Sequence, residues 1–133
     1  MKALIDTNVI LDVALNRAPF ARDSTDVLRW AEADGEAAVS WHSLSNCAYL
    51  LKDGARDFLE NLLRIVDVAP GAHAEARHAL SLPMKDVEDA LQAAAAFSWK
   101  ADYIVTRDPR GYAKSPVPAI SPAAFLRLTK RRR

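Results

Sequence analysis

Short apolar runs alternate along this chain with longer segments in which apolar residues recur every three or four positions. The runs are rich in valine, isoleucine, leucine and alanine and are bounded by polar or turn-forming residues, which predicts short buried strands. They occupy residues 3–5, 37–40, 65–68, 102–106 and 117–120. The first run leads directly into Asp6.

The segments between these runs have the spacing of amphipathic helices. We expect helices at residues 9–15, 21–33, 43–51, 55–63, 72–80, 87–100 and 123–128. Gly35, Gly54 and Pro83 lie beyond helix ends, and Ser121 followed by Pro122 is typical of a helix start. Strands that alternate with helices predict a three-layer α/β/α sandwich around a parallel sheet of about five strands.

Length and composition fit one domain of this kind. The chain has 133 residues, of which 50% are hydrophobic, enough for one compact core. We therefore expect a single domain over residues 1–129, followed by a basic tail at residues 130–133. Lysine and arginine number 18 against 17 aspartate and glutamate residues, so any binding of nucleic acid must depend on local patches.

The sequence indicates a cytoplasmic protein that does not enter a membrane. Cys47 is the one cysteine, which excludes an internal disulfide and a multi-cysteine zinc site and suits a reducing compartment. The first residues carry no apolar signal-peptide region, and no uninterrupted apolar stretch is long enough to span a bilayer.

Carboxylates follow two of the predicted strands and begin one predicted helix. Asp6 and Asp108 lie just beyond strands, and Asp86 and Asp89 lie three residues apart at the start of the alanine-rich helix. Ligands of open α/β sheets bind beyond the carboxyl ends of the strands, so these side chains are expected to meet at one edge. The alternative is structural, because aspartate also caps helices and forms turns.

Carboxylates that cluster in this way raise one another's pKa values unless a cation lies among them. Hard divalent cations prefer oxygen ligands, so Mg²⁺ or Mn²⁺ is the natural occupant. Such an ion lowers the pKa of bound water and neutralises charge on phosphoryl oxygens. The acidic residues therefore lead to the hypothesis of metal-assisted phosphodiester hydrolysis.

Four short segments occur in a particular order along the chain. They are residues 6–12 (DTNVILD), 86–94 (DVEDALQAA), 104–108 (IVTRD) and 118–126 (PAISPAAFL). In order and spacing they resemble the PIN domain family, the fold of the VapC-type toxin nucleases, over almost the whole chain. The resemblance implies that Asp6, Asp89 and Asp108 are the catalytic, metal-coordinating residues.

The resemblance also implies a substrate and partners. An endoribonuclease that is the toxin of a toxin–antitoxin pair would bind RNA and an antitoxin protein. PIN-like toxins commonly pair, and the apolar helices at residues 44–51 and 58–63 are expected to lie near one another, so we expect a homodimer. The polar side chains of Asn8 and Thr106 are expected to support the acidic residues.

Two positions depart from the family pattern. Many PIN nucleases have a glutamate about one turn into the third helix, where this chain has Asn46, a neutral ligand that lowers the negative charge of the site. Relatives often have a further aspartate before an aromatic residue, where this chain has Gly111 before Tyr112. We infer that Asp86, on the same helix face as Asp89, supplies the missing charge.

Basic residues in loops beside the predicted acidic edge are candidates for RNA contact. These are Arg17, Arg22, Arg107, Arg110 and Lys114. An ordinary solvated surface is the alternative for each of them. Glu88 is expected to point away from the acidic edge, and His42 is expected on the surface or in packing, because the three histidines share no metal-ligand spacing.

Two other functions remain open. A PIN scaffold whose acidic site has decayed would be a non-catalytic RNA-binding or protein-interaction module, and Asn46 and Gly111 favour that alternative. Phosphatases and receiver domains also place an aspartate after a first strand, where it accepts a phosphoryl group. Here Asn8 stands where a dehalogenase-type phosphatase needs a second aspartate, and the acidic pair of a receiver domain is missing.

Overall fold

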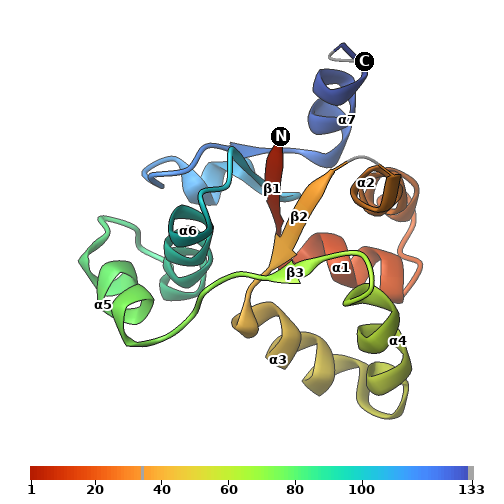
Figure 1. The fold of residues 1–133 in the computed structure, drawn as a ribbon, viewed down its shortest axis with the longest axis horizontal. Helices are drawn as coiled ribbons and strands as arrows, with labels where there is room; N and C mark the ends of the chain where they lie inside the picture. The colour runs from red at the N-terminus through yellow and green to blue at the C-terminus, as the bar shows by residue number, and fades with distance from the viewer. Residues whose placement is uncertain (34, 132–133) are drawn as a thin grey trace.

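The computed structural model of the protein describes residues 1–33 and 35–131. Within these residues the chain forms a five-stranded parallel sheet with helices packed on both faces (Figure 1). The strands are β1 (Lys2–Ile5), β2 (Glu36–Val39), β3 (Asp67–Val68), β4 (Tyr103–Val105) and β5 (Ala119–Ile120). The expected α/β/α sandwich and its parallel sheet are confirmed.

The helices follow the strands in the expected order. They are α1 (Thr7–Ala14), α2 (Ala21–Ala33), α3 (Trp41–Leu51), α4 (Ala55–Leu62), α5 (His73–Ser81), α6 (Val87–Trp99) and α7 (Pro122–Arg131). Two short 3₁₀ segments, η1 (Lys52–Gly54) and η2 (Pro109–Tyr112), lie between them. No helix of the described residues is both long enough and apolar enough to cross a bilayer.

The order of the strands places a switch point at the centre of the sheet. The order is β3-β2-β1-β4-β5, so the chain builds outward from β1 on one side and then crosses to β4 on the other. Ile5 of β1 lies opposite Val105 of β4 in the parallel register. The loops after these two strands therefore begin side by side and then diverge, which is where open α/β sheets bind ligands.

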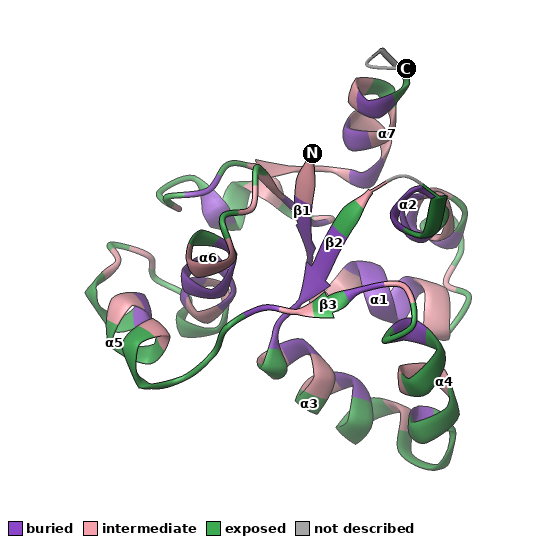
Figure 2. Ribbon diagram, in the orientation of Figure 1, coloured by how far each residue is buried: buried purple, intermediate pink, exposed green. Residues whose placement is uncertain are grey.

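Both faces of the central strands β1, β2 and β4 are largely buried, as Figure 2 shows for β1 and β2. Ala3 and Ile5 of β1 pack into the cluster that includes Phe125 of α7 and residues of α1, α2, α3 and α4. Leu4 points to the other face and packs with Ala93 and other residues of α6. In Figure 1, α5 and α6 accordingly lie on one side of the sheet and α1, α2 and α4 on the other.

Several element boundaries differ from the sequence-based expectation. α3 begins at Trp41 because the Ser40 hydroxyl accepts a hydrogen bond from the Ser43 amide (2.9 Å) and so caps this helix rather than ending a strand. The strand expected at residues 117–120 is limited to Ala119–Ile120. α7 continues to Arg131, so the first half of the expected basic tail is helical, while residues 132–133 lie outside the described residues.

Candidate active site

Asp6 stands at the switch point of the sheet, directly after β1. Its backbone amide donates to the Val105 carbonyl of β4 (2.9 Å), and its carboxylate Oδ1 accepts the Thr7 amide (2.8 Å), which caps α1. The side chain is buried, with 8% of the residue exposed. The capping role considered from the sequence is therefore real, and it leaves Oδ2 of the same carboxylate available for other contacts.

Gln92 of α6 holds Asp6 from the opposite layer. Its buried amide nitrogen donates to Asp6 Oδ1 (2.8 Å) and to the Ser43 hydroxyl (2.9 Å), while the Ser40 hydroxyl donates to its carbonyl oxygen. The sequence reasoning missed this residue. A long amide side chain within an alanine-rich, buried helix stripe is a signal that could have found it, because a buried polar group requires partners.

Tyr112 of η2 closes the other side of Asp6. Its hydroxyl donates to Asp6 Oδ2 (3.0 Å) and lies close enough to Asp89 to interact with that carboxylate as well. Burial of the ring and the negative charges of Asp6 and Asp89 raise the pKa of Tyr112 far above its ordinary value, so the phenol stays protonated. Tyr112 thus joins the first strand's carboxylate to that of α6, another contact that sequence reasoning did not foresee.

Gly111 lies against the carboxylates of Asp89 and Asp108. A Cβ atom at this position would meet Asp89 Oδ2 at 2.7 Å and Asp108 Oδ2 at 3.5 Å. The distance between these two carboxylate oxygens therefore cannot exceed the sum of those two distances. The glycine that departs from the family pattern therefore makes room for the acidic side chains instead of adding one.

The negative charge of the acidic cluster has its clearest effect on the pKa of Asp89. Burial, followed by the charges of Asp86 and Asp6 and, more weakly, of Asp108, raises the pKa of Asp89 from 3.8 to about 6, against a lowering by the Tyr112 hydrogen bond. All four aspartates highlighted by the sequence are therefore close enough to interact. A bound cation would relieve this repulsion and return the pKa of Asp89 to lower values.

The donor set of this edge suits a hard divalent cation. Its polar atoms are carboxylate oxygens from two strand ends and one helix start, which are the ligands that Mg²⁺ and Mn²⁺ prefer. In the described part of the chain, however, no three side chains of histidine, cysteine, aspartate or glutamate are already arranged as a metal-ligand cluster. The acidic residues converge as expected, and ligation of a metal by them stays a prediction.

Asn8 and Thr106 connect the loops that carry the acidic residues. The Asn8 amide donates to the Thr106 hydroxyl (3.3 Å), and its carbonyl oxygen accepts the Arg107 backbone amide (3.2 Å). The same Thr106 hydroxyl accepts the Asp108 amide (3.1 Å). These contacts fix the start of α1 against the turn after β4, and with it the positions of Asp6 and Asp108.

Two of the expected RNA-contacting arginines are held by a buried carboxylate. Asp12 of α1 is fully buried, and its oxygens lie 3.0 Å from Arg17 Nε and 2.8 Å from Arg107 Nε. The contact with Arg107 is an ion pair without hydrogen-bond geometry. Sequence reasoning quoted Asp12 only as part of a motif, but its position fixes both guanidinium groups close to the acidic residues.

A cavity of about 300 Å³ opens in front of Asp6 and Asp89. Its walls include both arginines, Asn8, Gln92, Asn46, His42 and Glu88. Glu88 was expected to point away from the acidic edge, but it lines this cavity, as does the partly exposed His42, and Glu88 Oε1 approaches His42 Nε2 at 3.7 Å. The Asn46 amide contacts the same ring nitrogen (3.1 Å), so its contact is with His42.

Asp86 lies on the far side of Asp89 and caps α6. Its Oδ1 accepts the Asp89 backbone amide at 3.1 Å. Asp86, Asp89 and Gly111 line a second cavity of about 260 Å³ together with Arg110 and Lys114, two further basic candidates of this edge. Four of the five basic candidates are therefore divided between two cavities that share the Asp89 wall, while Arg22 lines neither of them.

A parallel α/β sandwich with carboxylates gathered at its switch point defines the class of protein. A model of the PIN domain family matches residues 2–110, a span that contains all the acidic residues described above. The chain belongs to the PIN domain family. A search of curated protein sequences found no match to this chain.

Solved structures with the same fold accompany the family match. VapBC2 from Rickettsia felis, bound to a DNA fragment from its promoter, superposes with a TM-score of 0.71 at 16% identity, covering 91% of this chain and 98% of that chain. A toxin–antitoxin complex from Klebsiella pneumoniae gives 0.69 at 18% identity, covering 90% and 97%. VapBC-1 from nontypeable Haemophilus influenzae gives 0.64 at 13% identity, covering 92% and 99%. At these identities the similarity is one of fold.

Proposed function

We propose that this chain is a metal-dependent endoribonuclease that hydrolyses RNA phosphodiesters. The observation that carries the proposal is the meeting of Asp6, Asp89 and Asp108 at the switch point, where their mutual repulsion raises the pKa of Asp89 and Gly111 leaves space beside two of them. These three side chains would hold Mg²⁺ or Mn²⁺, with Asp86 adding charge from the cap of α6.

The chemistry of a bound divalent ion is to activate water and to neutralise charge on the phosphoryl group. The residues of the chain prepare the site for it. Gln92 and the Thr7 amide fix Oδ1 of Asp6, and Tyr112 orients its Oδ2. Arg17 and Arg107, held by Asp12, are positioned to bind the phosphate backbone of the strand in the cavity.

The similar solved structures support a proposal for the biological role of this chain. The similar structure from Klebsiella pneumoniae is a toxin–antitoxin complex. We therefore propose that this chain is the toxin of such a pair, acts in the cytoplasm and is inhibited by an antitoxin protein. Arg110 and Lys114 extend the basic surface beside Asp89 along which RNA would pass.

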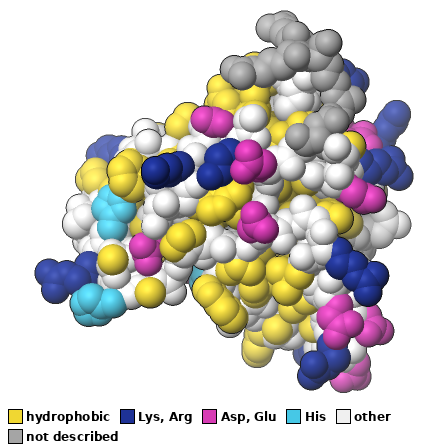
Figure 3. Space-filling view, in the orientation of Figure 1, with side chains coloured by type: hydrophobic (Ala, Val, Ile, Leu, Met, Phe, Trp, Pro, Cys, Tyr) yellow, Lys and Arg dark blue, Asp and Glu magenta, His cyan; other side chains and the backbone are white. Residues whose placement is uncertain are grey.

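A hydrophobic surface supports the proposal of a homodimer. Figure 3 shows hydrophobic side chains gathered over α3 and α4. Tyr49 and Leu50 of α3 are 79% and 52% exposed, and Leu63 just beyond α4 is 45% exposed. Exposed apolar residues that gather on one face of a small domain are typical of a protein interface.

The decisive experiment is cleavage of a mixed RNA pool with Mg²⁺ or Mn²⁺, comparing wild type with Asp6→Asn. Asparagine is an equally good helix cap, so the variant should fold while losing one charged oxygen of the site. We expect metal-dependent cleavage by the wild type and none by the variant. Absence of cleavage by the wild type under every metal condition would overturn the proposal.

A second function is favoured by a specific set of contacts. The amide at the family's glutamate position, Asn46, contacts His42, and within the described residues no ready-made cluster of three metal ligands exists. A non-catalytic RNA-binding or protein-interaction module would show these features. Calorimetric titration with Mn²⁺ separates the two, because the nuclease requires metal binding that Asp89→Asn weakens, and the binding module does not.

A further inference from the structure

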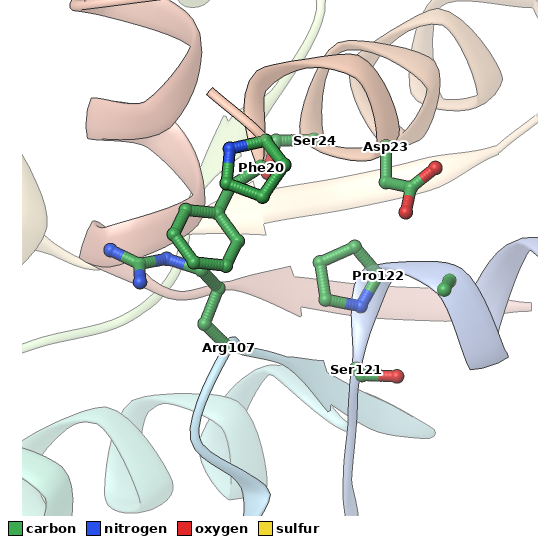
Figure 4. Close-up of a pocket in the computed structure, with 8 residues that line it drawn as sticks. Phe20, Asp23, Ser24, Arg107, Ser121 and Pro122 are labelled. Carbon is green, nitrogen blue, oxygen red and sulfur yellow. The ribbon is translucent and has the colours of Figure 1, made fainter. Parts of the chain in front are cut away.

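A third cavity adjoins the acidic site and has a different lining. It has a volume of about 460 Å³, within the size range of ligand sites, and is lined by Pro19, Phe20, Asp23, Ser24, Arg107, Ser121, Pro122 and Ala123. Figure 4 shows the rings of Phe20 and Pro122 with a gap between them, and Asp23, another lining residue, on α2 above Pro122. We call this space the Phe20 cavity.

The Phe20 cavity shares a wall with the cavity in front of Asp6 and Asp89. Arg107 lines both of them. Asp12 anchors that wall, because its carboxylate contacts Arg107 on one side and accepts a hydrogen bond from the Ser24 hydroxyl (3.5 Å) on the other. A strand whose phosphate lies at Arg107 therefore has its neighbouring group at the entrance to the Phe20 cavity.

The side chains of the Phe20 cavity suit a flat heterocycle. Phe20 is 41% exposed, and its ring stacks under the Arg107 guanidinium with the carbon atom Cζ 4.1 Å from the ring centroid. Aromatic rings and arginine planes are the surfaces on which unpaired bases stack. The proline ring of Pro122 offers an apolar surface for the opposite face of the base.

The negative charge of Asp23 favours a heterocycle that presents hydrogen-bond donors along one edge. Asp23 is half-buried and has no hydrogen bond or ion pair with another of the described residues. A carboxylate only accepts hydrogen bonds and repels phosphate, so its partner must present N–H groups. Guanine presents two such donors side by side, which match the two oxygens of a carboxylate, whereas the other bases present fewer.

We propose that the Phe20 cavity binds an unpaired guanine base of the RNA next to the phosphate at Arg107. The base stacks on Phe20 and donates from its Watson–Crick edge to Asp23. This subsite rests on the proposed RNA substrate. It gives the chain a sequence preference that the acidic residues, which contact only the phosphate backbone, do not supply.

The test uses free nucleotides without metal, so that it does not depend on catalysis. Guanosine 5′-monophosphate, and the adenosine, cytidine and uridine analogues, are titrated into the ¹⁵N-labelled full chain in the presence of a chelator. We expect guanosine monophosphate to shift the backbone amides of Phe20, Asp23 and Ala123 more strongly than the others do. No shift of these amides, or equal shifts with all four nucleotides, would overturn the proposal.

Variants then assign the roles of the two recognising side chains. Phe20→Leu keeps apolar volume but removes the flat ring, and should weaken guanosine monophosphate binding by roughly 5- to 100-fold, the range for loss of one base–aromatic stack. Asp23→Asn should remove the preference for guanine while other nucleotides bind as before. Phe97→Leu is the matched control, because Phe97 is a similarly exposed ring (54%) that packs against His78 instead.

The result also separates this proposal from the proposed nuclease function. Guanine-selective shifts in a chain that never cleaves RNA would keep the subsite and overturn the nuclease, leaving an RNA-binding module. Metal-dependent cleavage without any nucleotide shift at Phe20 would keep the nuclease and overturn the subsite. Unchanged affinity in both Phe20→Leu and Asp23→Asn would place the base elsewhere and likewise overturn it.

Discussion

Replacing Gly111 with alanine tests the acidic site with a single added methyl group. The new Cβ would lie 2.7 Å from Asp89 Oδ2, closer than any stable contact, and 3.5 Å from Asp108 Oδ2, an ordinary contact. Because the obstructing atom is the end of a flexible side chain, the Asp89 carboxylate can rotate away without disturbing the backbone. The substitution therefore displaces one oxygen of the proposed metal site and leaves the fold in place.

The expected magnitudes differ for stability and for metal binding. Gly111 does not have a positive φ, so alanine fits its backbone and should stabilise the protein by about 0.4–1 kcal/mol through the unfolded state, an effect that the rotation of Asp89 offsets. Metal affinity should fall by about 10- to 100-fold, the usual effect of disturbing the groups that orient a ligand.

The assay is calorimetric titration with Mn²⁺ alongside urea unfolding of the same samples. Gly54→Ala is the matched control, because a Cβ at Gly54 meets nothing within 4 Å and that residue also lacks a positive φ. It should retain Mn²⁺ affinity and gain about 0.4–1 kcal/mol of stability. Unchanged Mn²⁺ affinity in a folded Gly111→Ala protein would mean that Asp89 does not bind metal in its observed position.

Four further predictions concern the same site and the surface. Gln92→Leu leaves the polar partners of Gln92 without its amide, so the free energy of unfolding measured in urea should fall by roughly 1–3 kcal/mol. Full cleavage activity in this variant would contradict a role of Gln92 in orienting Asp6. Asp86→Asn keeps the helix cap but should lower Mn²⁺ affinity in calorimetry; equal affinity would leave Asp86 as a cap alone. Because the pKa of Asp89 is raised from 3.8 to about 6, the metal-free protein should lose stability as pH rises through this window, and thermal unfolding of Asp89→Asn should lack that slope; a slope equal to that of the wild type would assign it to another group. Light scattering should show a dimer that Tyr49→Asp converts to monomer, and a wild-type monomer at high concentration would remove the dimer proposal.

The sequence alone determined the architecture and the acidic residues. Alternating strand and helix patterns predicted the parallel sheet, because periodicity and helix starts such as Ser121-Pro122 depend on neighbouring residues only. Asp6 and Asp108 could be placed at one edge for a similar reason. In a parallel sheet every strand's carboxyl end lies on the same side, so a position just after a strand already fixes the edge.

Tertiary structure alone decided which side chains serve that edge. Gln92 and Tyr112 reach Asp6 from 86 and 106 positions along the chain, and no local spacing encodes such contacts. Glu88 was expected to point away, but the packing of α6 beside α3 brings it to His42. These arrangements depend on how whole layers pack across the sheet.

The two departures from the family pattern show the same division. The sequence revealed that Asn46 and Gly111 lack carboxylates, but not what each does instead. The fold turns Asn46 toward His42 and sets Gly111 against Asp89 and Asp108, where a side chain would collide with them. Residue type fixed which charges are present. Only the packing of η2 against α6 determined where the charged side chains lie and how closely they approach one another.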